Sequence, residues 1–347
     1  MRNDRARILA LLRGRGRYLL TGHVNPDGDS VASQCALRLI LEGLGSRADI
    51  VSSHPVPRAY RFLSGSERFT PRRPRGWKSY AALIVLDCGD ALRAGGLLEP
   101  RPPLPIVNID HHATNPGFGD LNWVVPSACS TAEIVHGIAT GLGVRPRGAL
   151  AEALYTGLLT DTGSFRHGNA TPRAFRIASA LVASGIDPAG IAQAVYDSVP
   201  YETLRALGET LAGLRRTPDG RIAWIRLPRR VLAGLANRAE TEEWARYPRS
   251  LDTAEIAVCF KETAPGEVRL SFRSKGAIDV AALAARWGGG GHRNAAGATA
   301  RGSLASVERA VIDAAQRHLA AAGGARAARR VSTNPARPSG ARAYARR

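Results

Sequence analysis

Four segments of the sequence carry aspartate and histidine residues at points where an apolar stretch stops. They read TGHVNPDGDS (21–30), LDCGD (86–90), NIDHHATN (108–115) and LLTDTGSF (158–165). Three of them follow predicted strands, and the carboxyl ends of parallel strands meet at one edge of a sheet, where ligands usually bind. We therefore expect one cluster there, made of His23, Asp27, Asp29, Asp87, Asp110, His111, His112 and Asp161.

Such a cluster predicts metal binding. Neighbouring carboxylates repel one another and raise each other's pKa values unless cations lie between them. Carboxylates with a few imidazoles and no cysteine favour an ion such as Mn²⁺ over a zinc-thiolate site. Five aspartates and three histidines exceed the needs of one ion and suit two ions that share a carboxylate. An Asp after a strand is usually only a turn or helix-cap residue, so the inference depends on the four segments together.

The elements that must position these residues alternate between strands and helices up to about residue 190. Strands are predicted at 17–24, 48–53, 79–87 and 105–110, and helices at 30–45, 130–143, 148–160 and 171–185. This alternation predicts an α/β domain, residues 1–190, with a mainly parallel sheet flanked by helices.

The rest of the chain predicts a smaller second domain. Residues 191–215 are typical of a helical linker, and residues 216–322 of an α+β domain. That domain has predicted strands at 221–228, 254–263 and 267–275, and a helix at 305–323. Residues 323–347 are rich in arginine, and we expect them to form a disordered tail.

Composition narrows the class of protein. The net charge of +19 fits an anionic partner such as a nucleotide or nucleic acid, but an arginine surplus from genome base composition would look the same. The four cysteines are far apart, which predicts buried thiols and no disulfide framework. No long apolar run or secretory signal stands out, so we expect no membrane contact and a cytoplasmic location.

The four polar segments, in this order, resemble the signature motifs of the DHH phosphoesterases, a family named after the triplet seen here as Asp110-His111-His112. Residues 273–298, RSKGAIDVAALAARWGGGGHRNAAGA, resemble the signature of the DHH-associated substrate-binding domain. The resemblance covers about residues 5–322 and implies the fold described above. Length and motif set are most similar to the NrnA-like branch of the family.

The resemblance implies a division of the metal ligands. His23, Asp27 and Asp87 would bind one ion. The second set shares Asp87 as the bridging ligand and consists of Asp29, Asp87, His111 and Asp161. The cofactor implied is Mn²⁺, two ions per chain, which Mg²⁺ or Co²⁺ could replace. Two such ions activate water for attack on phosphorus.

The resemblance also implies substrate contacts. His112 would lie beside the substrate phosphate, and Asp110 would orient a ligand histidine. In the second domain, glycines let backbone amides approach a phosphate because they have no Cβ. The contacts expected there are Arg273, Ser274, Gly289, Gly290, Gly291 and His292, with Asn294 supporting the loop.

The activity implied is hydrolysis of short oligonucleotides to 5′-mononucleotides and of 3′-phosphoadenosine 5′-phosphate (pAp) to AMP. Cyclic di-AMP and its linear product pApA are further candidate substrates, and a homodimer is expected. Three alternatives remain open at this point. They are a RecJ-like single-strand exonuclease, a family II inorganic pyrophosphatase, and a non-catalytic nucleotide- or nucleic-acid-binding protein that uses the arginine-rich tail.

Overall fold

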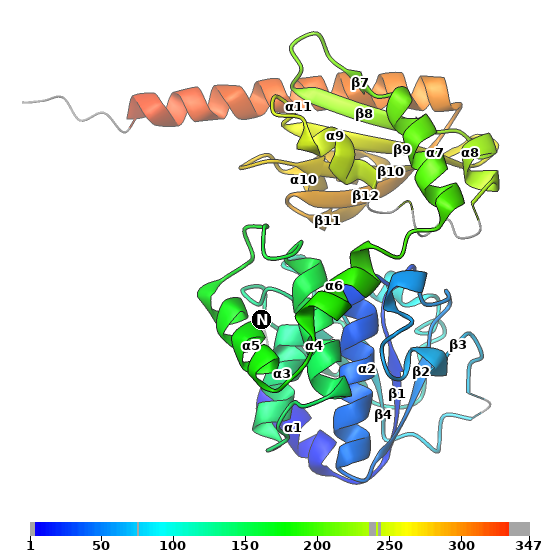
Figure 1. Ribbon diagram of the computed structural model, residues 1–347, viewed down its shortest axis with the longest axis vertical. Coiled ribbons are helices and arrows are strands. Elements are labelled where there is room, and N and C mark those ends of the chain that lie inside the picture. Colours follow the sequence, from blue (N-terminus) through cyan, green and yellow to red (C-terminus); the bar gives the residue numbers. More distant parts are fainter. Residues whose placement is uncertain (1–3, 75, 236–240, 242–243, 333–347) are drawn as a thin grey trace, which may run out of the picture. The chain divides into compact units, whose positions relative to one another are not determined.

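The computed structural model describes residues 4–74, 76–235, 241 and 244–332. The chain forms two compact units, one up to Leu204 and the other from Arg205 onward (Figure 1). Each unit has its own six-stranded sheet and its own hydrophobic core.

The sheet of the first unit is parallel throughout, with strand order β3-β2-β1-β4-β5-β6. Its strands are β1 (Arg17–Thr21), β2 (Arg47–Val51), β3 (Phe69–Thr70), β4 (Ala82–Leu86), β5 (Ile106–Asp110) and β6 (Leu121–Val124). β1 pairs with β2 on one side and with β4 on the other, so the order in which strands are added reverses between β1 and β4.

Helices cover one face of this sheet (Figure 1). They are α1 (Arg5–Arg13), α2 (Gly28–Gly43), α3 (Thr131–Gly141), α4 (Ala149–Asp161), α5 (Pro172–Ala183) and α6 (Pro188–Tyr196). Short 3-10 turns lie at η1 (Arg58–Tyr60), η2 (Ser66–Arg68) and η3 (Ala91–Ala94). Alternate side chains of each strand point to opposite faces. Leu20 and Ile84 therefore pack under the helices, while Leu19 and Val85 pack on the other face.

The helix starts follow from capping residues. Ser130 accepts a hydrogen bond from the amide of Glu133, and Glu133 accepts one from the amide of Cys129, which is a capping-box arrangement shifted by one residue. Thr171 caps α5 by accepting from the amide of Ala174, ahead of a proline in the first turn.

The sheet of the second unit is mixed, with order β11-β12-β10-β9-β8-β7. β8 and β9 are parallel and the other pairs are antiparallel. The strands are β7 (Arg215–Arg216), β8 (Ile222–Leu227), β9 (Ile256–Ala264), β10 (Glu267–Ser274), β11 (Gly290–His292) and β12 (Ala295–Arg301).

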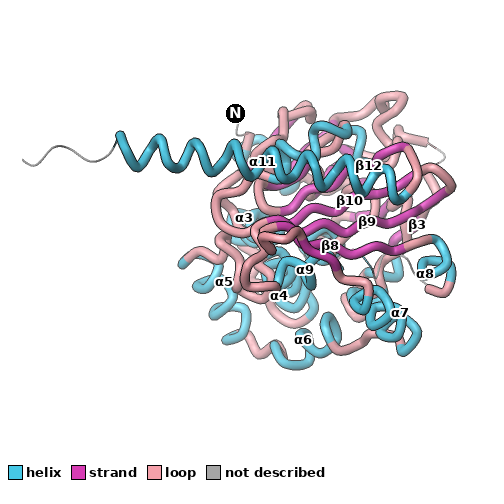
Figure 2. The backbone as a smooth tube through the Cα atoms, turned by 90° about the horizontal axis from the view of Figure 1, so that it is seen from above, coloured by secondary structure: helices cyan, strands magenta, loops and turns pink. Residues whose placement is uncertain are grey.

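Helices pack on both faces of this second sheet. They are α7 (Tyr201–Ala212), α8 (Arg229–Ala233), α9 (Arg246–Ser250), α10 (Val280–Ala284), η5 (Ala285–Trp287) and α11 (Leu304–Ser332). Figure 2 shows α11 running across the strands. Buried Glu308 fastens it there by accepting hydrogen bonds from the Trp224 indole at 2.8 Å and from the Arg215 guanidinium at 3.1 Å.

The α/β class predicted from the sequence is confirmed, with a parallel sheet in the first unit and a second sheet in the C-terminal region. All four cysteines are buried thiols, as predicted. The C-terminal part differs from expectation. Residues 323–332, expected to begin a disordered tail, continue α11, and residues 333–347 lie outside the described residues. No helix within the described ranges is long and apolar enough to cross a membrane.

Candidate functional site

The polar cluster lies where the strand order of the first unit reverses. His23 follows β1 and Asp87 follows β4, and these two strands are hydrogen-bonded neighbours. The loops after two such strands run in opposite directions and leave room for a ligand between them. The site therefore occupies the position that an open parallel sheet offers most readily for binding.

Asp87 has an unusual backbone conformation that directs its carboxylate into this space. Its φ is 53°, in the left-handed region that residues with a Cβ rarely adopt. The backbone amide of Asp87 donates to the Ile109 carbonyl at 3.0 Å, and the Thr131 hydroxyl donates to Asp87 Oδ1 at 3.1 Å. Strain held by several contacts at one residue is typical of a functional position.

One group of potential ligands surrounds His23. Its Nε2 lies 3.6 Å from Asp27 Oδ2 and 3.6 Å from Asp87 Oδ2. His23 Nδ1 lies 2.8 Å from the Val24 carbonyl, which can only accept, so Nδ1 carries hydrogen. In the neutral ring, Nε2 then presents its lone pair toward the carboxylates, as a metal-ligating histidine does.

A second group surrounds His111. Its Nε2 lies 3.7 Å from Asp87 Oδ1, 3.7 Å from Asp161 Oδ2 and 4.0 Å from Asp29 Oδ2. His111 Nδ1 lies 3.3 Å from the Ala128 carbonyl. Asp87 thus uses Oδ2 toward the His23 group and Oδ1 toward the His111 group, so one carboxylate takes part in both.

Asp29 is held by the first turn of α3. Its Oδ2 accepts from the amide of Thr131 at 2.6 Å, and its Oδ1 accepts from the amide of Ala132 at 2.9 Å and from the Ser33 hydroxyl at 3.1 Å. Amides at a helix N-terminus favour a negative charge. The helix therefore fixes the position of a carboxylate that is almost completely buried.

Asp161 is held by Asn169, a residue that the sequence motifs did not single out. The Asn169 amide donates to Asp161 Oδ2 at 3.2 Å, to the Asp161 carbonyl at 3.2 Å and to the Cys129 carbonyl at 2.8 Å. Asn169 lies between the fourth motif and the start of α5, where a polar residue predicts only a loop.

Without a metal ion, the charged groups of the cluster shift one another's pKa values strongly. Burial lowers the pKa of His23, but Asp27 and Asp87 outweigh it and raise the value to about 10. His111 is raised to about 9, because Asp161 and Asp87 outweigh its burial. Burial and the charge of Asp87 raise the pKa of Asp29 well above its ordinary value, and burial above all raises that of Asp161 to about 7.

The donor set fits divalent cations. His23, Asp27 and Asp87 each offer one ligand atom within 4.8 Å of the others, and so do Asp29, Asp87 and His111. The atoms are carboxylate oxygens and imidazole nitrogens, which suit Mn²⁺ and similar ions. Because their pKa values are raised, these groups keep protons when no metal is bound. A cation in each group would replace those protons.

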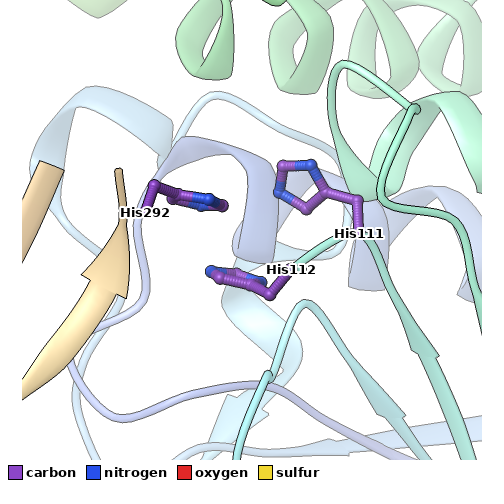
Figure 3. Close-up of side chains that lie close together, drawn as sticks. All are labelled: His111, His112 and His292. Carbon is purple, nitrogen blue, oxygen red and sulfur yellow. The ribbon is translucent and has the colours of Figure 1, made fainter. Parts of the chain in front are cut away.

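His112 belongs to a different arrangement from His111. The two rings meet edge to face with centroids 5.0 Å apart (Figure 3). His112 Nδ1 lies 2.7 Å from Asp110 Oδ1. The expectation that Asp110 orients a ligand histidine is therefore corrected, since its hydrogen-bonded histidine is His112, while Nδ1 of His111 faces a backbone carbonyl.

Asp110 is fully buried and held in turn by an asparagine. Its Oδ2 accepts from the Asn115 side-chain amide at 2.6 Å and from the His112 backbone amide at 3.2 Å. Burial would raise the pKa of Asp110, but the hydrogen bond with His112 outweighs it and, with Asn115, lowers the value to about 2. Asp110 is therefore an ionised acceptor.

The expected substrate residues of the second unit lie around β10, β11 and β12. Gly290, Gly291 and His292 form β11, which pairs with β12, so the glycine run is part of a hairpin. Gly291 has a φ of 142°, and a Cβ there would lie 2.5 Å from the Ala295 carbonyl oxygen. Gly289, just before β11, would place a Cβ 2.1 Å from the Gly297 carbonyl oxygen. These two glycines are needed for the hairpin itself.

Arg273, Ser274 and Asn294 are the other expected contacts. Arg273 lies near the end of β10, half-buried. Ser274 is buried, donates to the Ile278 carbonyl at 2.8 Å and accepts from the Asn294 amide at 2.8 Å. The Asn294 amide also donates to the Gly276 carbonyl at 3.1 Å, so Asn294 and the Ser274 hydroxyl hydrogen-bond within the loop.

Comparisons with known proteins place this geometry in a family. Residues 17–158 match the DHH family, N-terminal domain, and residues 230–321 match the DHHA1 domain. The bifunctional oligoribonuclease and PAP phosphatase NrnA of Thermus thermophilus is 32% identical over 89% of this chain and 92% of its own length. A probable protein of the same name from Streptococcus mutans is 29% identical over 87% of this chain and 94% of its own.

A solved structure has the same fold. An exopolyphosphatase-related protein from Bacteroides fragilis superposes with a TM-score of 0.79 at 23% identity, covering 90% of this chain and 94% of that one. DHH proteins are phosphoesterases, the class that the histidine and carboxylate cluster indicated. The chain belongs to the DHH family, and within it to the NrnA type.

Proposed function

We propose that this protein hydrolyses short oligonucleotides to 5′-mononucleotides and pAp to AMP, using two divalent metal ions. The observation that carries the proposal is the placement of Asp87, with Oδ2 toward His23 and Oδ1 toward His111. The substrates come from the names of relatives that match almost the whole chain.

Mn²⁺ is the ion that we propose, two per chain, with Mg²⁺ or Co²⁺ as substitutes. Bound there, the ions would supply an activated water and offset charge on the phosphoryl oxygens. His23, Asp27 and Asp87 would hold one ion. The other would be held by Asp29, Asp87, His111 and Asp161.

The chain's own residues supply proton transfer and binding. We propose His112 as the group that donates a hydrogen bond to the phosphoryl oxygens or protonates the leaving oxygen, with Asp110 holding its ring. Arg273, His292 and the backbone of Gly290 would bind a terminal phosphate or nucleotide, since exposed glycine amides can approach an anion closely and donate to it.

We also propose further substrates, an oligomeric state and a cellular location. Cyclic di-AMP and pApA are candidate substrates because they contain the same phosphodiester chemistry. A homodimer in the cytoplasm is what we expect of the working protein. Size-exclusion chromatography with light scattering on the full chain tests the dimer.

One substrate panel tests the function. Purified full-length protein is incubated with pAp, pApA, cyclic di-AMP, an RNA dinucleotide, an RNA tetranucleotide and a long single-stranded DNA, each with Mn²⁺, Mg²⁺ or chelator. We expect turnover of pAp and of the short RNAs with Mn²⁺ and none with chelator. Equal turnover of the long DNA would instead support a RecJ-like exonuclease, and binding without turnover a nucleotide-binding protein.

A further inference from the structure

The loop after β5 contains a buried asparagine that connects three parts of the site wall. The side-chain amide of Asn115 donates to Asp110 Oδ2 at 2.6 Å, to Asn108 Oδ1 at 2.7 Å and to the Cys88 carbonyl at 3.3 Å. Asn108 belongs to β5 and Cys88 follows β4. Asn115 thereby joins the ends of two neighbouring strands at the place where the His-Asp cluster begins.

The remaining hydrogen-bonding groups of Asn115 fix the loop itself. Its Oδ1 accepts from the amide of Gly117 at 2.8 Å, and its backbone amide donates to the carbonyl of His112 at 3.1 Å. An asparagine side chain offers one acceptor oxygen and two donor hydrogens, and all of them have partners here. These hydrogen bonds fix the Asn115 side chain in one orientation. Asn115 in turn fixes the orientation of the Asp110 carboxylate.

The fixed carboxylate defines the state of the His112 ring. Asp110 Oδ2 already accepts from two N–H groups, and the 2.7 Å contact between Asp110 Oδ1 and His112 Nδ1 is that of an N–H donating to a carboxylate. The Cβ of His112 also lies against Gly89, where an added Cβ would come within 2.9 Å of it. The ring is thus held both by a hydrogen bond and by close packing.

We propose that Asn115 is a positioning residue for phosphoester hydrolysis. It orients Asp110, which accepts the Nδ1 hydrogen of His112 and so leaves Nε2 as the nitrogen that meets the substrate; the ring donates there once Nε2 has also taken up a proton. This inference rests on the proposed function in that His112 must act on the phosphoester. Asp110 and His112 are not among the metal ligands proposed above, although His112 Nδ1 lies 3.9 Å from Asp87 Oδ1.

The chain offers a matched control in Asn122. This asparagine is equally buried and also clamps a loop, accepting from the amide of Gly119 at 3.0 Å and donating to the Gly119 carbonyl at 2.8 Å. It contacts neither Asp110 nor His112. Asn122→Ala removes a side chain of the same kind and leaves the hydrogen bonds among Asn115, Asp110 and His112 in place.

The first test is kinetic. For Asn115→Ala we expect kcat on pAp to fall about 10- to 100-fold, the usual range for a group that orients a site residue, with KM and Mn²⁺ affinity nearly unchanged. Asn122→Ala should keep the wild-type kcat. In an Asp110→Asn background, Asn115→Ala should cost less than about threefold, because the residues act through one another. Equal losses of kcat in the two Ala variants, or losses that multiply in the double variant, would overturn the proposal.

The second test reads the ring directly and needs no turnover. Full-length protein labelled with ¹⁵N-histidine has only eight histidines, and His112 is assigned by its loss in His112→Asn. Long-range ¹H–¹⁵N spectra with Mg²⁺ should show the neutral His112 ring protonated at Nδ1, and a mixture of tautomers in Asn115→Ala. If that variant does not fold, Asn115→Ser serves in its place.

An unchanged tautomer in a folded Asn115 variant contradicts the proposal. If the wild-type protein hydrolyses none of the panel substrates, the proposed function fails. The tautomer experiment still decides the role of Asn115 in that case, so the two failures are distinguishable.

Discussion

The sheet end of the first unit and the β11–β12 hairpin of the second unit are built in opposite ways. At the sheet end, ionisable side chains are buried within 4.0 Å of one another and move each other's pKa values far from the ordinary range. In the hairpin, the backbone is open to solvent at Gly290 and packs tightly against β12 at Gly291. Polar side chains such as Asn294 hydrogen-bond within the loop. The sheet end depends on the charges of its side chains. The hairpin depends on the small volume of its glycines.

The difference teaches which changes each region tolerates. A buried charge that loses its partners costs several kcal/mol, so the sheet end should respond strongly to any change in charge. A backbone surface without a Cβ should respond to an added methyl group and little to charge. We therefore expect changes of charge at the sheet end to have larger effects than changes of volume in the hairpin.

Asp87→Asn keeps the side-chain volume and removes the charge that both ligand groups share. We expect kcat/KM on pAp to fall at least about 10³-fold, at the upper end of the loss seen when one electrostatic contact is removed. The melting temperature of the metal-free protein measures the balance between the lost repulsion of Asp29 and the lost attraction to His23 and His111. Asp27→Asn is the comparison, since Asp27 is 60% exposed and takes part in one group. Equal losses from the two variants would contradict the bridging role.

Mn²⁺ affinity should depend on pH with a definite sign. Compared with ordinary values of 3.8 and 6.5, the pKa is raised to about 7 at Asp161 and about 10 at His23. The metal-free folded state therefore binds more protons than the unfolded state from about pH 4 to pH 10, and its free energy of unfolding falls as pH rises through that window.

Mn²⁺ must displace those protons, so its affinity should rise with pH by about tenfold per unit for each proton released. Isothermal titration calorimetry at pH 6, 7 and 8 in buffers of different ionisation enthalpy measures both affinity and proton release. Binding without proton release would mean that the carboxylates and imidazoles do not exchange protons for metal.

The hairpin offers a pair of glycines that separates ligand binding from folding. A Cβ on Gly290 would meet nothing within 4 Å, whereas one on Gly291 would meet the backbone of β12. Gly290→Ala should therefore keep the melting temperature and raise KM about tenfold, the effect of roughly 1.4 kcal/mol of lost binding. Gly291→Ala should lower the melting temperature. If folded Gly290→Ala has the KM of the wild-type protein, β11 does not bind the phosphate.

Glu308→Ala should have the smallest effect on activity. It leaves the buried Trp224 indole N–H without its partner, which costs about 1–3 kcal/mol of unfolding free energy. Denaturant unfolding measures this loss, and kcat/KM on pAp should stay within about twofold of wild type. A larger loss of activity would show that α11 contributes to the reaction as well as to folding.

Much of the first unit could be predicted from its sequence. Strands such as Ala82–Leu86 are continuous apolar runs, and helices such as Pro172–Ala183 carry a capping threonine and a proline in the first turn. β6 (Leu121–Val124) was not predicted, because a four-residue strand at a sheet edge gives too short a pattern. β11 and β12 were missed because glycine and alanine runs have no strand periodicity.

The sequence indicates the charged residues of the cluster but not the residues that hold them in place. Aspartates and histidines at strand ends carry a chemical signal, so His23 and Asp87 could be named in advance. Asn115 and Asn169 could not, because an asparagine in a loop looks like any turn residue. The partner of Asp110 was misjudged for the same reason, since sequence order does not say which of two adjacent histidines turns back toward it.

The two-sided placement of Asp87 also restricts how such a site can diverge. In the proposed two-ion site one side chain serves both groups, so a substitution there would disturb both ions together. A descendant that works with one ion, or with none, must first lose an outer residue such as Asp27, which is exposed and also serves as a helix cap. Asp87 should therefore be the last of the cluster to vary.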